Sequence, residues 1–253
     1  MLVPRLRKFS HEDRLKIAHN IADRVVKKHG NNVLAVYVCG STSKRLDRPF
    51  SDLELIVVVR DRAEIAMKYY LHRGLIIQIE YLKSSKILSD AEQFTDNWPW
   101  EADQYRNRIA LYERDRWFKR LDEAVAKNDK KNSVVAIRKS FMMMTESMAA
   151  LRNAVLTNDK AGVLSRGRLL AEDAARILLL LNRRYVTTTS WLWKIVFGMH
   201  NNPKDFKKLV DKMSGFMPTA EEEVVASSER LYKEMSELVA HYGVKIERDH
   251  LWV

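Results

Sequence analysis

The sequence of 253 residues predicts an α+β protein, with a mixed sheet and flanking helices in the first half and a helical bundle in the second. Two observations predict this class. Short β-branched runs alternate with amphipathic stretches in the first half, and from about Arg116 onward apolar residues recur with the 3.6-residue period of helices. The polar run Lys127–Asn132 marks a boundary, so residues 1–126 and 127–253 form the two predicted domains.

The first half reads as alternating helices and strands. Ser10 and Asp13 form a predicted capping box for a helix that ends at Gly30. The expected strands cover 33–38, 52–60, 75–82 and 108–112, and further helices are expected over 62–72 and 84–94.

The second half reads as helices throughout. Thr219 and Glu222 form a second predicted capping box, and Gly243 is a suitable residue just past a helix end. The expected helices cover 133–156, 160–183, 190–199, 203–213 and 219–242.

Composition limits the classes to which the chain can belong. A hydrophobic fraction of 46% argues against a disordered chain, and the single cysteine, Cys39, excludes an internal disulfide framework and a cysteine-based zinc site. No apolar run approaches the length of a membrane span, and the first ten residues lack the apolar core of a signal peptide. We therefore expect a cytoplasmic protein with no membrane partner.

The net charge of +11 points to an anionic partner or to a basic surface. The excess is local, because residues 126–215 hold 17 basic and 7 acidic residues. No motif of a nucleic-acid-binding module is present, so we do not expect nucleic acid as a partner.

The segment from Gly40 to Glu54 carries the chemistry. A predicted strand ends at Gly40, and Ser41 can begin a short helix whose free N–H groups would hold a phosphate. Asp52 and Glu54 lie two residues apart on the next strand, and therefore point to the same face. Two carboxylates beside a phosphate are what Mg²⁺ binding needs, and two such ions can clamp both oxygens of an in-line displacement.

The Gly-Ser turn, its spacer and the Ser-Asp-x-Glu sequence resemble the signature of the polymerase-β-like nucleotidyltransferase superfamily. The kanamycin nucleotidyltransferase type, or aminoglycoside 4′-nucleotidyltransferase, is the more similar branch. It shares the spacer with Pro49 and Phe50, and matching segments follow patchily along most of the chain.

The resemblance implies a nucleotidyltransferase-type sheet followed by an acceptor-binding and dimerisation domain. It implies transfer of a nucleoside monophosphate from an NTP, with ATP the expected nucleotide, to a hydroxyl group, and release of pyrophosphate. Gly40, Ser41, Lys44 and Arg45 would bind the nucleotide. Asp52, Glu54 and a third acid, for which Glu80 is the best candidate, would hold Mg²⁺.

The resemblance also maps a general base onto Glu146, serving an active site that a second subunit completes, so it implies a homodimer. Apolar neighbours of Glu146 would keep it from water and suit it to proton abstraction. The alternative is a surface glutamate paired with Arg152 or Lys139.

This sequence departs from the family pattern at two places that concern the acceptor. Met142 and Met143 stand where the family carries glutamates that help to bind a polycationic antibiotic, and Ala150 replaces a lysine. A basic helical half would repel such a molecule. We therefore expect a neutral, apolar or anionic acceptor, with the run Met142–Met144 in the core or lining an acceptor pocket.

Two other functions remain open. The chain could be a minimal nucleotidyltransferase of a toxin–antitoxin pair that acts on a protein or an RNA, which the basic blocks favour. It could also be an inactive nucleotide-binding scaffold, against which the intact Asp52 and Glu54 argue.

Overall fold

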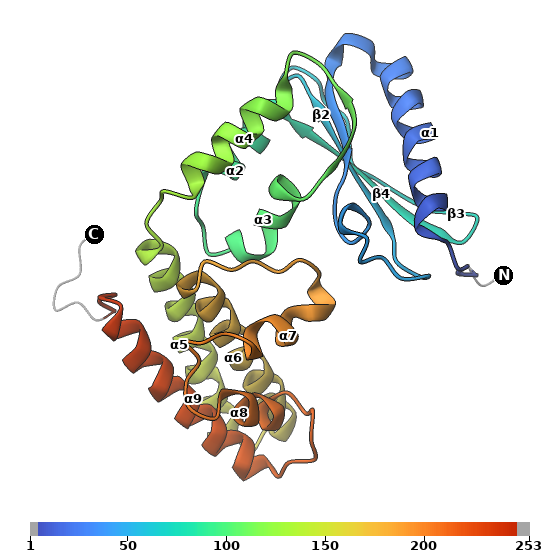
Figure 1. Cartoon of the computed structure of the whole chain (residues 1–253). Helices are drawn as coiled ribbons and strands as arrows, with labels where there is room; N and C mark the ends of the chain where they lie inside the picture. Colours follow the sequence, from blue (N-terminus) through green and yellow to red (C-terminus); the bar gives the residue numbers. More distant parts are fainter. Residues whose placement is uncertain (1–4, 247–253) are drawn as a thin grey trace. The chain divides into compact units, whose positions relative to one another are not determined.

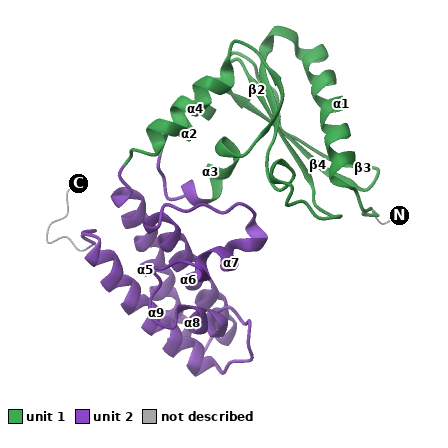
Figure 2. Cartoon of the chain, viewed as in Figure 1, with its two compact units in different colours: residues 1–93, 100–131 green, residues 94–99, 132–253 purple. Residues whose placement is uncertain are grey.

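The computed structural model of the chain describes residues 5–246. It contains two compact units, coloured separately in Figure 2: unit 1 comprises residues 1–93 and 100–131, and unit 2 comprises residues 94–99 and 132–253. The predicted boundary after residue 126 falls inside a helix, α4 (Trp117–Asn128), and the units part only after Lys131. Residues 94–99 belong to unit 2, which no composition change in the sequence indicates.

Unit 1 is a mixed sheet covered by helices on both faces (Figure 1). Its strands are β1 (Val33–Val38), β2 (Leu53–Val59), β3 (Lys68–His72), β4 (Leu75–Lys83) and β5 (Ile109–Glu113), in the order β3-β4-β2-β1-β5. The pair β2–β4 is parallel and the other pairs are antiparallel. The fold class predicted from the sequence is therefore confirmed.

Alternation along the strands divides the core into two layers. Odd-numbered β2 residues such as Leu53 and Leu55 pack with α1 (His11–His29), whereas Ile56 and Val58 pack toward α2 (Ser84–Glu92) and α4. The remaining helix, α3 (Trp98–Arg106), has no counterpart among the predicted elements.

The predicted helix over 62–72 is wrong, because this stretch leads into the edge strand β3. Arg73 and Gly74, both with positive φ, form the two-residue turn of a β3–β4 hairpin. Gly74 therefore marks a hairpin turn and not a helix end, and the aromatic pair Tyr69-Tyr70 favours a strand. The other strands and the capping box of Ser10 and Asp13 are confirmed.

Unit 2 is a helical bundle. Its helices are α5 (Val134–Leu156), α6 (Lys160–Leu181), α7 (Leu192–Phe197), α8 (Phe206–Met213) and α9 (Glu221–His241). Helix α6 packs against α5, α7, α8 and α9, and its side chains from Ile177 to Leu180 are fully buried. The stacked rings of Phe141 and Tyr232 join α5 to α9.

Two details of unit 2 differ from the predictions. The residue that precedes α9 is Ala220, and Thr219 forms no capping bond, so the second capping box is absent. The predicted helix over 190–199 is divided into a short 3-10 helix, Thr189–Trp191, and α7. Within residues 5–246, no helix is long and apolar enough to cross a membrane.

Candidate active site

Asp52 directly precedes β2, and Glu54 is the second residue of that strand, on the face of the sheet that α2 and α4 cover further along. Ile56 follows Glu54 on that face and is buried against these helices. In the parallel pair β2–β4, Glu54 lies opposite Gln78 and Ile56 opposite Glu80. Glu54 therefore lies on this face of the sheet, and Asp52 is near enough for its charge to act on Glu54.

The Glu54 carboxylate packs directly on Gly40. A Cβ at residue 40 would lie 1.7 Å from Glu54 Oε2, and Gly40 has φ of +63°, so any other residue here would displace the Glu54 carboxylate and strain the backbone. Burial raises the pKa of Glu54, and the charge of Asp52 raises it further, while Lys44 opposes the shift. Two carboxylates that repel each other in a half-buried place favour a bound cation.

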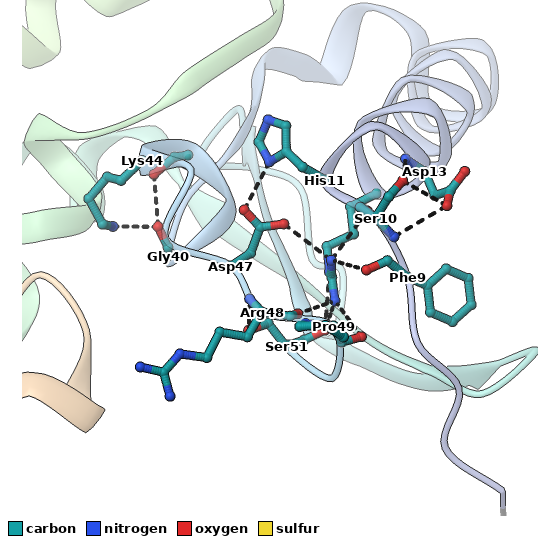
Figure 3. Close-up of polar contacts among 12 residues, drawn as sticks. Phe9, Ser10, His11, Asp13, Gly40, Lys44, Asp47, Arg48, Pro49 and Ser51 are labelled. Atoms are coloured by element: carbon teal, nitrogen blue, oxygen red, sulfur yellow. Dashed lines mark hydrogen bonds and ion pairs between the residues drawn. The ribbon is translucent and has the colours of Figure 1, made fainter.

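Lys44 is fixed inside unit 1. Its ammonium group donates to the Gly40 carbonyl (Figure 3) and forms an ion pair with Asp103 Oδ2 at 2.5 Å. Asp103 in turn accepts a hydrogen bond from Asn107 Nδ2. Ser43 Oγ lies 2.9 Å from the carbonyl oxygens of both Gly40 and Asn107 and can donate its one proton to either. Lys44 therefore places a positive charge beside Glu54 and holds the turn against α3.

The turn after Gly40 is a 3-10 helix, Thr42–Lys44. Ser41 precedes it without a side-chain capping bond, and its carbonyl accepts from the amides of Lys44 and Leu46. Arg45 follows with φ of +55° and is exposed. Of the two basic residues predicted to bind nucleotide, Arg45 is the accessible one.

A buried arginine holds the loop that precedes Asp52. Arg14 of α1 is 1% exposed, and its guanidinium bonds to Asp47 Oδ2 at 3.1 Å. The other carboxylate oxygen of Asp47 lies 2.9 Å from His11 Nδ1 (Figure 3). The guanidinium also donates to five backbone carbonyls, those of Phe9, Ser10, Arg48, Pro49 and Ser51. Sequence analysis missed Arg14, because nothing in the helical pattern distinguishes it from a surface residue.

Glu80 lies on the same face but further along the sheet. Burial raises its pKa, and Lys86 of α2 opposes this shift. Among residues 5–246, no group of three His, Cys, Asp or Glu side chains is arranged to hold a metal ion. Gln78, and not Glu80, occupies the position opposite Glu54, and a metal site shared by Asp52, Glu54 and Glu80 stays a prediction.

Glu146 lies on α5 in unit 2 and is exposed, so the burial expected for it is absent. Met144 is in the core, whereas Met142 and Met143 are 49% and 39% exposed. The neighbouring Ser147 donates to Asp173 Oδ2 of α6 at 2.7 Å.

Asp173 is a carboxylate that the sequence analysis missed. Burial raises its pKa, and the hydrogen bond from Ser147 opposes the shift. The sequence does contain a signal for it. Asp173 is a carboxylate within an apolar run of α6, and the same pattern identifies Glu146 as a candidate base. Asp103 gave no such signal, since α3 itself was not predicted.

Three comparisons place these features among known proteins. The family model described as the KNTase C-terminal domain matches residues 115–245. Two curated proteins, each named aminoglycoside nucleotidyltransferase (4′), from Staphylococcus aureus and from Bacillus sp, are 28% identical to this chain over 105 residues. Each match covers 41% of this chain and 41% of the relative.

A solved structure shares the fold. The nucleotidyltransferase-like protein from Exiguobacterium sibiricum superimposes with a TM-score of 0.56 at 16% identity, over 92% of this chain and 81% of that chain.

Proposed function

The chain belongs to the KNTase C-terminal domain family, and from this premise we propose that it is a nucleotidyltransferase. It transfers a nucleoside monophosphate from an NTP, with ATP the expected donor, to a hydroxyl group of an acceptor. The observation that carries the proposal is the pair Asp52 and Glu54, presented on one face of the sheet against the Gly40 turn.

The donor set fits a magnesium ion. Asp52 and Glu54 offer hard oxygen ligands. Burial raises the pKa of Glu54 and the charge of Asp52 raises it further, and a divalent cation would relieve both effects. Mg²⁺ bound there would offset negative charge on the reacting phosphate. We also propose Glu80 as a third ligand. Glu54 faces Gln78 of β4, and Glu80 lies two residues beyond Gln78.

The reaction requires one bond to form and one to break. The acceptor oxygen attacks the α-phosphorus, the bond from that phosphorus to the oxygen bridging the β-phosphate breaks, and pyrophosphate leaves. Gly40, Ser41 and Arg45 would bind the β- and γ-phosphates, with Lys44 as a fixed charge behind them. The hydroxyl proton would pass to a carboxylate, for which we propose Glu146 of a second subunit.

Pyrophosphate release tests the proposal. Wild type with MgATP and a panel of alcohols should release pyrophosphate, and Asp52→Asn should release it roughly 100-fold more slowly or worse. Asp23→Asn is the matched control, because Asp23 is an exposed aspartate of α1 in the same unit. Equal rates in wild type and Asp52→Asn would refute the mechanism, and nucleotide binding without turnover would instead indicate a scaffold.

The same assay tests the base. Glu146→Gln should lower the rate by about 100-fold, as expected for loss of a general base. Asp173→Asn is the comparison, since Asp173 is the other carboxylate next to Ser147. A larger loss in Asp173→Asn would move the role of base to that residue.

We also propose a homodimer. Helix α5 exposes several large apolar side chains within unit 2, among them Val135 at 74%, Met142 at 49% and Leu156 at 80%. Such a face is typical of a protein interface. Sedimentation should show a dimer for wild type and a shift toward monomer for Met142→Glu, whereas Lys130→Glu outside α5 should leave the dimer intact. A monomeric wild type would contradict this proposal.

The acceptor, we propose, is less cationic than an aminoglycoside. The residues 126–215 hold 17 basic and 7 acidic residues, and Met142 and Met143 are exposed near Glu146 in place of acidic side chains. Exposed methionines offer a polarisable apolar surface that suits a neutral or apolar acceptor.

A further inference from the structure

A cavity of about 670 Å³ lies in unit 1 on the face of the sheet opposite Asp52 and Glu54. Helix α1 forms one wall, and the hairpin of β3 and β4 forms the other. Its β4 residues Ile77 and Ile79 alternate with Gln78 and Glu80, which point to the other face. None of its lining residues belongs to the nucleotide site proposed above.

The rim of the cavity is basic. Six of its lining side chains are basic, and none of the lining residues is acidic: Arg24, Lys28, His29, Lys68, His72 and Arg73. Across residues 5–246, no ion pair within 4.0 Å neutralises Arg24, Lys28, Lys68 or Arg73. Burial lowers the pKa of His29, and the charges of Lys28 and Lys68 lower it further, which agrees with a positive potential in the cavity.

The floor of the cavity is aliphatic. Ile21 and Val25 of α1 face Ile77 and Ile79 of β4, and Tyr70 of β3 stands at the side, 47% exposed. A ligand seated there would bury an apolar body on these side chains while an anionic group met the rim. The volume is within the range of about 300–1,000 Å³ typical of small-molecule sites.

We propose that this cavity binds a soluble small molecule with an anionic phosphate or carboxylate head and an aliphatic body. The unpaired cations select the head, and the aliphatic floor selects the body. A bare inorganic anion lacks the apolar part. Tyr70 and Tyr81 also line the cavity, but most of its apolar lining is aliphatic, which favours an aliphatic body over stacked bases. The site is independent of the proposed transfer reaction, so it extends that function rather than resting on it.

Calorimetric titration with decyl phosphate, kept below its micelle concentration, tests the proposal on the full chain. We expect saturable binding with one molecule per chain. The double variant Arg24→Gln/Lys28→Gln should bind about tenfold more weakly or worse, because two charge-assisted contacts are lost. Lys16→Gln/Lys27→Gln is the matched control, with the same change of charge at exposed positions of α1 that do not line the cavity.

Two further ligands test the contributions of the anionic head and of the aliphatic body separately. Decyltrimethylammonium, with the same chain and a cationic head, should not bind, and butyl phosphate should bind much more weakly than decyl phosphate. Equal affinity of the two double variants, or equal binding of the cationic ligand, would overturn the proposal. Binding that appears only with vesicles of anionic lipid, or only with RNA, would also overturn it, because it would indicate a different partner.

Discussion

At the scale of single residues, Gly40 and Glu54 depend on each other. Glu54 Oε2 occupies the space where any other residue at position 40 would place its Cβ. The sequence analysis selected Gly40 as a turn that lets a phosphate approach closely. The structure shows in addition that the glycine lets a carboxylate of the next strand lie against the backbone.

Gly40→Ala therefore should displace Glu54 and also strain the backbone. We expect pyrophosphate release to fall roughly 100-fold, since a misplacement of about 1 Å is enough for such a loss. Gly30→Ala is the control, because Gly30 also has a positive φ, but a Cβ at residue 30 would have no other atom within 4 Å. Both variants should unfold at lower urea concentration, but only Gly40→Ala should lose activity. Equal activities would show that the position of Glu54 is unimportant.

At the scale of elements, α1 stabilises the loop that leads into β2. The guanidinium of Arg14 satisfies the carbonyls of that loop, and the Arg14 and Asp47 side chains are each only 1% exposed. The loop 47–51 has no regular hydrogen-bonding partner strand, so this contact fixes the backbone immediately before Asp52.

Arg14→Leu leaves Asp47 buried without its cation, and we expect the free energy of unfolding to fall by about 3–5 kcal/mol. Urea denaturation followed by circular dichroism measures the loss. Lys16→Leu, an exposed change on the same helix, should alter it by less than about 0.5 kcal/mol. A loss for Arg14→Leu as small as that of the control would mean that the loop is held by other contacts.

Elements were predictable from sequence where a local pattern decides them. The capping box of Ser10 and Asp13 and the buried runs of β1 and β2 depend on neighbouring residues, and they are confirmed. The edge strand β3 was taken for a helix, because its conformation depends on pairing with β4 rather than on its own pattern. Tertiary pairing of this kind overrides local propensity.

In the candidate site, too, residues placed by local pattern were predictable, and residues placed by distant contacts were not. Asp52, Glu54 and Gly40 were found because strand period and turn chemistry are local. The roles of Arg14, Asp103 and Asp173 depend on contacts between residues far apart in the chain, such as Lys44 with Asp103, and no single-segment pattern shows them.

At the scale of the whole molecule, the net charge of +11 should govern which acceptors approach. For a polycationic acceptor such as kanamycin, raising the ionic strength from about 0.01 M to about 0.15 M shortens the Debye length from about 30 Å to about 8 Å and weakens the repulsion. We expect kcat/KM for the polycation to rise with salt.

A neutral alcohol serves as the control acceptor, and its kcat/KM should change little over the same range. Steady-state pyrophosphate release measures both. A fall in kcat/KM for kanamycin with salt would show that the acceptor is attracted, and it would contradict the proposal that the natural acceptor is less cationic.

Cys39, the single cysteine of the chain, lies between the last residue of β1 and Gly40, and burial raises the pKa of its thiol. Such a thiol is inert toward alkylating reagents while the surrounding structure is closed. A cysteine introduced on the surface can therefore carry a fluorophore without removal of the native one. In the unmodified chain, the slow alkylation of Cys39 provides a clock for how often the sheet opens beside the Gly40 turn.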